Sequence, residues 1–485
     1  MKTIAAVATA LSNSGISIIR VSGDDAVDIV DRIFVTDSDK RLSGCASHTI
    51  NHGYIVNKNM TDMSCDSSSS DQREHLSGEP YEVIDEVLVS VMKAPHSYTG
   101  EDVVEINTHG GVAVTKKVLD IVLRAGASIA EPGEFSKRAF LNGKMDLSQA
   151  EAVMDIIEAD NNIALKNGIS QLRGDVAEEI EEIRDLLIRE IAHIEASNDD
   201  PEHIDYDVFD FQLDKTVLSS IERLEILIQS FEKGRIVRNG LNTVILGKPN
   251  AGKSSLMNNL LGTERAIVTD IAGTTRDSLE ESLNIGDVTL RLTDTAGIRE
   301  TTDRVESLGV DRSKKLSTDA DLILYVVDSS VPLSDEDEDI IRLTKDKKMI
   351  VVYNKTDLEP MVSSDDLCKL LTEYGHSKGD YIILPVSLKD NTGVKDITDK
   401  ISEMFGLGAV KTSNEVMLTN IRHKEAVSNA VNSLKNVMKG ISDGVPVDCL
   451  TIDLMDAYSF LGYVIGKNVD EDLIDNVFSR FCLGK

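Results

Sequence analysis

The pattern of hydrophobic and polar positions divides the chain into four stretches. In residues 1–118, short apolar runs separated by Gly- and Ser-rich turns predict β-strands. In residues 119–241, apolar residues recur every three or four positions, which predicts helices. Strand-like runs alternate with helical segments over 242–405, as in an α/β domain with a mostly parallel sheet, and helical spacing returns over 406–485. We therefore predict a β-rich N-terminal domain and one helical domain into which the α/β domain is inserted.

Individual runs make these predictions specific. In the first stretch we expect strands in 3–10, 15–23 and 83–92, and a surface loop in the Ser-rich segment 64–80. The strands expected in the α/β domain are 241–246, 288–294, 322–328, 349–353 and 381–387. A long acidic helix carries one apolar stripe: Val176, Ile180, Ile183, Leu187, Ile191 and Ile194. The last stretch carries two more stripes: Val427, Val431, Leu434, Met438 and Ile441, then Leu450, Leu454, Ala457 and Leu461. Packing in a helical bundle is the simplest interpretation of all three stripes.

Composition narrows the class of protein. The 485 residues include 83 acidic and 51 basic residues, which gives a formal net charge of −32 at pH 7. This balance argues against a nucleic-acid surface along the whole chain and against a basic membrane anchor. No apolar run approaches the ~20 residues of a membrane span. The five cysteines are scattered without a CxxC pair, which indicates a reducing compartment and gives no zinc signal. We expect a cytoplasmic protein with no membrane partner.

The strongest chemical signal is GKPNAGKS at 247–254, which fits G-x-x-x-x-G-K-[ST]. It lies between a predicted strand and a predicted helix, which is the context that this motif requires. The glycines let backbone N–H groups wrap the phosphates, Lys253 would reach the β- and γ-phosphates, and Ser254 would hold Mg²⁺. The segment therefore predicts a nucleotide site.

Three further motifs follow predicted strands in the order expected of a GTPase. In DTAG, Asp294 can hold Mg²⁺ through water, and the Gly297 amide can sense the γ-phosphate. In NKTD, Asp357 can accept two hydrogen bonds from guanine, and Asn354 braces the loop. A backbone amide of SLK at 387–389 could reach the guanine O6. The predicted GTP contacts are Asn250, Ala251, Gly252, Lys253, Ser254, Ser255, Thr269, Asp270, Ile271, Ala272, Gly273, Thr274, Thr275, Asp294, Thr295, Ala296, Gly297, Asn354, Lys355, Asp357, Ser387, Leu388 and Lys389.

The residue after DTAG leaves the means of hydrolysis open. Ras-type GTPases place a water-orienting Gln there, and this chain has Ile298, whose aliphatic side chain cannot orient water. The polar loop 266–277 offers two interpretations. It is either an ordinary switch loop or a cage of carbonyl and hydroxyl oxygens that holds a monovalent cation where an arginine finger would otherwise lie.

Over nearly its full length the chain resembles the MnmE (also TrmE) family of tRNA-modification GTPases. The P-loop is shared by thousands of proteins, but GEFSKRAFLNGK, AGTTRD and a C-terminal CLGK together are highly specific. The resemblance implies a multidomain α+β and α/β protein. Its parts would be a β-rich folate-binding domain like the aminomethyltransferases, a helical bundle, and an inserted Ras-like P-loop GTPase domain. The segments that carry the resemblance are 15–23, 97–111, 131–153, 247–258, 266–277, 294–300 and 481–485.

In the N-terminal domain, the resemblance implies a site for a tetrahydrofolate one-carbon derivative, 5-formyl- or methylene-tetrahydrofolate, at a homodimer interface. Arg20, Glu105 and Lys144 stand at the family's folate-contacting positions, and Cys482 and Lys485 would lie near the pocket. Arg and Lys suit carboxylates, and Glu suits the N–H groups of a pterin. Taken alone, the charged residues would be interpreted as surface charges, and Cys482 as helix packing.

In the GTPase domain, the resemblance implies a K⁺ site beside the nucleotide. The K⁺ ligands correspond to Asn250, Thr269, Ile271 and Thr274, and Thr275 joins Ser254 on Mg²⁺. Hydrolysis would be accelerated by K⁺-dependent approach of two GTPase domains. A Glu after DTAG, here Glu306, would position the attacking water. We predict Glu306, Arg276 and Cys482 as the catalytic residues.

The resemblance also implies a partner, the flavoprotein MnmG, in a heterotetrameric complex. Together the two proteins would install an aminomethyl or carboxymethylaminomethyl group at carbon 5 of the wobble uridine, position 34, of certain tRNAs. FAD would belong to the partner, since this chain has no GxGxxG of its own. The acidic excess is heaviest on 119–241 and nearly absent from 406–485. Any tRNA contact on this chain is therefore expected on the C-terminal helices.

Two other functions remain open on the residues alone. One is a nucleotide-switched RNA or ribosome assembly GTPase without modification chemistry, although no basic RNA-binding domain is visible. The other is a folate-dependent methyltransferase with a regulatory GTPase. Three departures from the family pattern are ALSNSG at 10–15 in place of a Pro/Gly-rich turn, the apparent insertion 64–80, and Leu388 in place of Ala.

Overall fold

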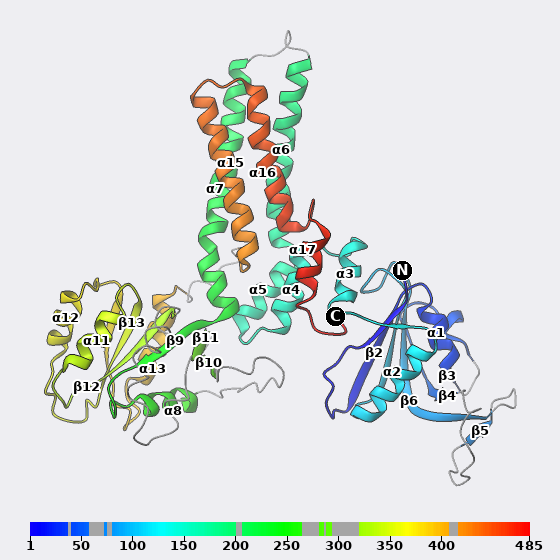
Figure 1. Ribbon diagram of the computed structural model, residues 1–485, viewed down its shortest axis with the longest axis horizontal. Helices are drawn as coiled ribbons and strands as arrows, with labels where there is room; N and C mark the ends of the chain where they lie inside the picture. The colour runs from blue at the N-terminus through cyan, green and yellow to red at the C-terminus, as the bar shows by residue number, and fades with distance from the viewer. Residues whose placement is uncertain are drawn as a thin grey trace. The chain divides into compact units, whose positions relative to one another are not determined.

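The computed structural model describes residues 1–36, 40–57, 72–74, 80–199, 206–263, 281–285, 288–292, 320–406 and 416–485. These residues form two compact units (Figure 1). The first unit contains Met1–Met154 and Leu461–Lys485, and the second contains Asp155–Phe460.

A mainly antiparallel sheet forms the centre of the first unit, in the order β3-β4-β6-β7-β2-β1-β8, with β5 paired to β6. Among the described strands of this sheet, only the β1–β8 pair is parallel. Its strands are β1 Ile4–Val7, β2 Ile16–Ser22, β3 Phe34–Val35, β4 Thr49–Asn57, β5 Gln72–Glu74, β6 Pro80–Met92, β7 Val103–His109 and β8 Ser128–Ile129. The strands expected in 3–10, 15–23 and 83–92 are thus confirmed.

Helices cover one face of this sheet. The apolar sides of α1 (Ala26–Ile33) and α2 (Val112–Arg124) pack on every second residue of the central strands, such as Ile19, Val89 and Ile106. The alternate residues point to the opposite face. Among them are three large apolar side chains that remain exposed: Ile16 (60%), Ile50 (69%) and Leu88 (45%).

The first unit is larger than the expected 1–118. That boundary falls inside α2, and β8 beyond it completes the sheet. α3 (Glu134–Leu141) and most of α4 (Leu147–Ile157) also belong to the unit, together with α17 (Glu471–Phe478) near the C-terminus. Leu147, Ala150, Met154, Ile474, Phe478 and Phe481 form one apolar cluster. Burial of this cluster, which helical spacing alone does not reveal, holds the C-terminal segment in the first unit.

The Ser-rich segment 64–80 is not wholly a loop. Residues 72–74 form β5, which pairs antiparallel with the start of β6 at Tyr81 and Glu82. Residues 64–71 and 75–79 of this segment lie outside the described residues. The loop prediction is therefore wrong at β5, because pairing with a neighbouring strand overrode the polar composition.

The second unit combines a helical bundle with a six-stranded sheet. The bundle helices are α5 Asn162–Arg173, α6 Asp175–Asp199, α7 Tyr206–Asn239, α15 Ile421–Ser442 and α16 Val447–Ile465. The end of α16, from Leu461 on, belongs to the first unit. The predicted stripe on α6 is fully buried, as is that on α16. On α15 the stripe is buried as far as Leu434, whereas Met438 and Ile441 are half-buried. Bundle packing is therefore confirmed for all three stripes.

The sheet order is β10-β11-β9-β12-β13-β14, with every pair parallel except β10–β11. Its strands are β9 Leu241–Leu246, β10 Glu281–Ile285, β11 Val288–Leu292, β12 Leu322–Asp328, β13 Lys348–Asn354 and β14 Tyr381–Pro385. Its helices are α8 Lys253–Thr263, α11 Asp335–Leu343, α12 Ser364–Glu373 and α13 Val394–Met404. Apolar clusters cover both faces, which confirms the predicted α/β domain. The carboxyl ends of β9, β12, β13 and β14 meet at one edge, where such sheets bind ligands.

Candidate functional site

The segment 247–254 is a phosphate-binding loop in its geometry. It joins the end of β9 to the first residue of α8, so its N–H groups lie at a helix N-terminus, which attracts anions. Gly247 and Gly252 have φ of 150° and 111°, which L side chains rarely adopt. A Cβ on Gly247 would lie 2.4 Å from the Val326 carbonyl oxygen. The loop therefore requires glycine at this position, as the motif does.

Lys253 lies over this loop. Its Nζ donates to the carbonyl oxygens of Gly247 at 2.6 Å and Lys248 at 2.8 Å. Burial lowers the pKa of this lysine. A partly desolvated ammonium at the mouth of an anion-binding loop is suited to a phosphate, whose charge would compete with the two carbonyl groups for the same donor.

Asn354, at the end of β13, braces the loop from the side. Its Nδ2 donates to the Ala251 carbonyl at 2.8 Å, and its Oδ1 accepts from the Leu388 amide at 3.2 Å. The side chain is buried, at 3% exposure. A Cβ on Gly252 would lie 2.4 Å from its Nδ2. The sequence predicted this bracing of the loop. Of the SLK amides considered for guanine O6, that of Leu388 donates to Asn354 in this structure.

The predicted base-recognition residues gather at the same edge. The Ser387 hydroxyl lies 3.1 Å from Oδ1 of Asp357. Lys355 has a left-handed backbone (φ 65°), and its Nζ donates to Oδ2 of Asp328 at 2.5 Å. Although burial opposes it, hydrogen bonds from Lys355 and Ser330 hold the pKa of Asp328 below its usual value. These contacts join the NKTD and SLK motifs to the end of β12.

The remaining predicted GTP, metal and catalytic residues of this domain lie outside the described residues, as does Ile298. The predicted residues concerned are Thr269, Asp270, Ile271, Ala272, Gly273, Thr274, Thr275, Arg276, Asp294, Thr295, Ala296, Gly297 and Glu306. The described part of the predicted K⁺ and Mg²⁺ site is therefore Asn250, which is exposed with φ 61°, and Ser254 at the start of α8. An amide oxygen and a hydroxyl are oxygen donors of the kind that these hard cations take. No group of three or more His, Cys, Asp or Glu is placed to hold a metal in the described segments.

A second polar site lies in the first unit. Arg20 on β2 is registered opposite Glu105 on β7, and its Nε donates to Oε1 of Glu105 at 2.8 Å. Its Nη1 donates to the Gly484 carbonyl at 3.1 Å. The guanidinium lies over the rings of Tyr98 and Phe135, at 5.1 and 5.7 Å from their centroids. Arg20 is thereby fixed from three sides.

The C-terminal tail completes this site. Gly484 has φ of 90°, and a Cβ there would lie 2.3 Å from the Val7 carbonyl oxygen, so the tail lies tightly on the end of β1. Burial, followed by the charge of Arg20, lowers the pKa of Lys485. One of the five expected folate-site residues stands apart from this arrangement: Lys144, whose Nζ donates to the Pro95 carbonyl at 3.1 Å. Cys482 is exposed, but it lies in the tail beside Lys485, whose amide donates to the Cys482 carbonyl at 3.3 Å.

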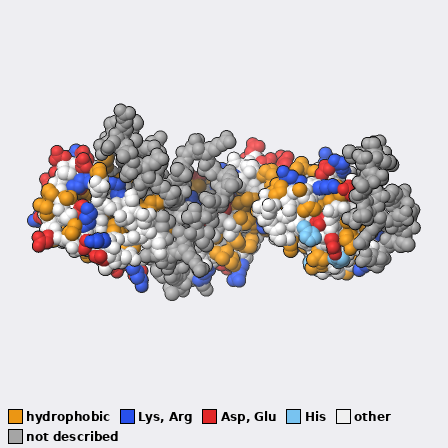
Figure 2. Space-filling model, turned by 90° about the horizontal axis from the view of Figure 1, so that it is seen from below, with side chains coloured by type: hydrophobic (Ala, Val, Ile, Leu, Met, Phe, Trp, Pro, Cys, Tyr) orange, Lys and Arg blue, Asp and Glu red, His pale blue; other side chains and the backbone are white. Residues whose placement is uncertain are grey.

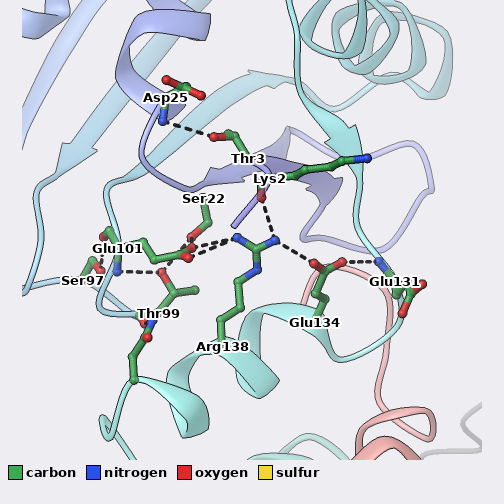
Figure 3. Close-up of polar contacts among 11 residues, drawn as sticks. Lys2, Thr3, Ser22, Asp25, Ser97, Thr99, Glu101, Glu131, Glu134 and Arg138 are labelled. Atoms are coloured by element: carbon green, nitrogen blue, oxygen red, sulfur yellow. Dashed lines mark hydrogen bonds and ion pairs between the residues drawn. The ribbon is translucent and has the colours of Figure 1, made fainter.

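Sequence reasoning missed one buried arginine. Arg138 on α3 is 4% exposed and reaches Glu101, Glu134 and the Lys2 carbonyl (Figure 3). It lies within the RAFLNGK motif, but a motif does not reveal that an arginine is buried. An arginine in an amphipathic helix is ordinarily interpreted as solvent-exposed.

The sheet order, the phosphate loop and the motifs at the carboxyl ends of its strands define a P-loop GTPase domain joined to a helical bundle and a separate β-rich unit. The family described as "GTP-binding protein TrmE N-terminus" matches residues 3–144, and that described as "MnmE helical domain" matches 147–482. The chain belongs to the MnmE family of tRNA modification GTPases.

Relatives named tRNA modification GTPase MnmE match over the whole chain. That of Lachnoclostridium phytofermentans is 50% identical over 484 residues, which cover 100% of this chain and 99% of the relative. Those of Acetivibrio thermocellus and Alkaliphilus oremlandii are 43% and 42% identical, with the same coverage. A solved structure, the G domain of the T. maritima FeoB iron transporter, is 24% identical. It covers 34% of this chain and 98% of its own, with a TM-score of 0.25 that does not bear on the fold. In the described part of this chain, no helix is long and apolar enough to cross a membrane.

Proposed function

We propose that this GTPase is stimulated by K⁺ and acts with a MnmG-type flavoprotein. Together the two would install an aminomethyl or carboxymethylaminomethyl group at C5 of the wobble uridine of tRNA. Full-length similarity to relatives named tRNA modification GTPase MnmE carries the proposal. The test is nucleoside analysis of tRNA from a strain that lacks this protein. We expect loss of the modified wobble uridine, and unchanged wobble uridines would contradict the proposal.

For the nucleotide, we assign the phosphates to Lys253 and the loop N–H groups, and Mg²⁺ to Ser254. Asp357 would select guanine, because its carboxylate can accept from both the N1–H and the 2-amino group, a donor pair that adenine lacks. The Leu388 amide could donate to the guanine O6 only if it gave up its 3.2 Å hydrogen bond to Asn354. Ala251, Gly252, Ser255, Lys355, Ser387 and Lys389 would complete the contacts.

For hydrolysis, we assign K⁺ to Asn250 with Thr269, Ile271 and Thr274, and Mg²⁺ to Thr275 and Asp294 beside Ser254. Glu306 and Arg276 would be catalytic, with Glu306 positioning the attacking water in place of the glutamine that Ile298 replaces. Comparison of GTP turnover in KCl and NaCl at equal ionic strength tests the K⁺ assignment. We expect faster turnover in KCl, and equal rates would refute it. Normal turnover of Glu306→Ala would refute the role of Glu306.

For folate, we assign the site around Arg20 in the first unit. A partly desolvated cluster of two cations and a carboxylate suits a ligand that carries both carboxylates and N–H groups, as tetrahydrofolate derivatives do. The bound folate would supply the one-carbon unit, while FAD would remain in the partner. Lys144 would join the site only by leaving the Pro95 carbonyl. Cys482 is exposed and is therefore accessible for a catalytic role.

For assembly, we propose a homodimer through the first unit. Its sheet has one face that α1 and α2 leave uncovered. α3 packs on the β1 end of that face, and Ile16, Ile50 and Leu88 are exposed elsewhere on it. Figure 2 shows, on the right, a face of this unit where apolar side chains lie among histidine and acidic ones. Exposed apolar patches with polar rims are typical of protein interfaces. The heterotetramer with the flavoprotein would be built on this dimer.

We also propose a cytoplasmic location. Cys45, Cys368, Cys449 and Cys482 form no disulfide within the described segments, as is usual where thiols stay reduced. The helices after residue 416 would make whatever contact this chain has with tRNA, because the acidic excess is smallest there. A crosslinking map that places tRNA on 170–232 would contradict this assignment.

A further inference from the structure

A buried arginine on α3 ties together several segments that surround the proposed folate site (Figure 3). Nη1 of Arg138 lies 3.2 and 3.1 Å from the two carboxylate oxygens of Glu101. Its Nη2 donates to Oε1 of Glu134 and to the Lys2 carbonyl, both at 2.8 Å. Because these acceptors come from the N-terminal segment, the turn before β7 and α3 itself, one guanidinium fixes three parts of the chain.

Glu101 also belongs to the turn 97–101, whose residues hydrogen-bond to one another and to Ser22 on β2. The Ser22 hydroxyl lies 2.8 Å from Oε2 of Glu101 and 2.7 Å from the Thr99 hydroxyl, and both Ser22 and Thr99 are fully buried. The Ser97 hydroxyl donates to the Glu101 carbonyl at 2.6 Å. Ser22 stands two residues after Arg20 on β2, so the two side chains leave the same face of the sheet. The turn is thereby held against the strand that carries Arg20.

The turn 97–101 and α3 each place an aromatic ring beside Arg20. Tyr98 lies 5.1 Å from the Arg20 guanidinium, and its hydroxyl lies 2.7 Å from that of Ser136 on α3. Phe135, also on α3, lies on the same guanidinium at 5.7 Å. Arg138 hydrogen-bonds to both elements that carry the rings, to the turn through Glu101 and to α3 through Glu134.

We propose that Arg138 is a positioning residue for the folate site and that it acts through Glu101 and Tyr98 on the orientation of Arg20. This inference rests on the proposed folate binding. Arg138 is 4% exposed, so it has no direct path to a ligand. Without its two terminal nitrogens, one side chain could no longer bond Glu101, Glu134 and the Lys2 carbonyl together, and the turn would shift. The ring beneath Arg20 would then move with the turn.

The primary test is Arg138→Lys in the full chain, which keeps the charge but loses the two-pronged hydrogen bonding. Calorimetry with 5-formyl-tetrahydrofolate measures the site, GTP affinity reports on the second unit, and thermal unfolding reports on stability. We expect folate affinity to fall about 10–100-fold, as is usual when a supporting residue is lost, with GTP affinity unchanged. Arg124→Lys is the matched control, because the pair of Arg124 with Asp120 is exposed on α2 of the same unit.

A double-mutant cycle separates positioning from general stability. Tyr98→Leu removes the ring through which Arg138 is proposed to act. The double variant Tyr98→Leu/Arg138→Lys should therefore bind folate about as well as Tyr98→Leu alone, whereas a purely structural role makes the two losses multiply. If Arg138→Lys does not fold, Ser136→Ala tests the same path by freeing the Tyr98 hydroxyl, and it should weaken folate binding more mildly.

Each outcome is informative. Unchanged folate affinity in Arg138→Lys, or multiplying losses in the cycle, overturns the positioning role and leaves the proposed function intact. For Ser136→Ala, unchanged affinity likewise overturns it. Failure of the unaltered chain to bind folate overturns the proposed folate site and this inference with it. These results are distinguishable because the unaltered chain is measured first.

Discussion

The P-loop takes its phosphate-facing groups from one run, 247–254, whereas the Arg20 site is assembled from β2, β7, the turn 97–101, α3 and the C-terminal tail. The first arrangement is dictated by backbone geometry: positive φ values and a helix N-terminus. The second depends on side chains brought together from both ends of the chain. A site built from one segment is therefore sensitive to substitutions within that segment. A site assembled from several segments is also sensitive to substitutions of residues that only hold those segments in place.

The largest effect should come from Gly247→Ala. The new Cβ would lie 2.4 Å from the Val326 carbonyl oxygen at a φ of 150°, so the loop must shift. A hydrogen bond to a charged group contributes about 1.5–3 kcal/mol, so losing two N–H contacts with the phosphates would cost about 100-fold or more in affinity. We expect at least that loss of GTP affinity by calorimetry, with folate affinity unchanged.

The matched control for this change is Gly262→Ala, at an exposed position of α8 with nothing within 4 Å of the added Cβ. It should keep full GTP affinity and stabilise the helix by about 0.5–1 kcal/mol. Equal GTP affinities of the two variants would show that the loop geometry does not set phosphate binding.

Next is Asn354→Ala, which leaves the Ala251 carbonyl and the Leu388 amide without their partner. A buried group left unsatisfied costs about 1–3 kcal/mol. We therefore expect GTP affinity to fall about 10–100-fold and the unfolding midpoint of the second unit to drop. Wild-type GTP binding would mean that the contact between the NKTD motif and the P-loop is dispensable. Residues 247–254 would then be sufficient to hold the phosphates without this brace.

A smaller effect, on the other site, is expected from Gly484→Ala. Its Cβ would lie 2.3 Å from the Val7 carbonyl oxygen, so the tail and Lys485 would move away from Arg20. We expect about a tenfold loss of folate affinity, the equivalent of about 1.4 kcal/mol, with GTP affinity unchanged. Gly15→Ala serves as the control, because nothing lies within 4 Å of its Cβ. Equal folate affinities of the two variants would remove the tail from the dispersed site.

The smallest effect concerns acid stability. The pKa of Asp328 is lowered in the folded state, so its contribution to stability is complete above the unfolded pKa near 3.8 and is lost as pH falls through the lower folded value. Asp328→Asn should therefore reduce the loss of stability of the second unit below about pH 4. Urea unfolding at pH 7 and pH 3 measures this. An unchanged difference between the two pH values would contradict the role of the Lys355 ion pair.

The sequence predicted much of the fold because periodicity is local. The stripe on α6 and the strands β9, β12 and β13 lie where the spacing placed them. The boundary at 118 was wrong because membership of a unit is decided by which apolar faces meet. The strand β5 was missed because its pairing with β6 does not show in a polar, Ser-rich composition.

The sequence by itself predicted the nucleotide site, since the P-loop and the NKTD and SLK motifs follow strands of one largely parallel sheet, and the carboxyl ends of such strands meet. Only the tertiary structure decided that Arg20 faces Glu105, that the tail reaches Arg20, and that Arg138 is buried at the centre of a polar network. The physical reason is the distance along the chain between the residues that interact. Backbone conformation and helix termini are fixed by neighbouring residues, whereas the burial and pairing of a charge depend on segments that are distant in the chain.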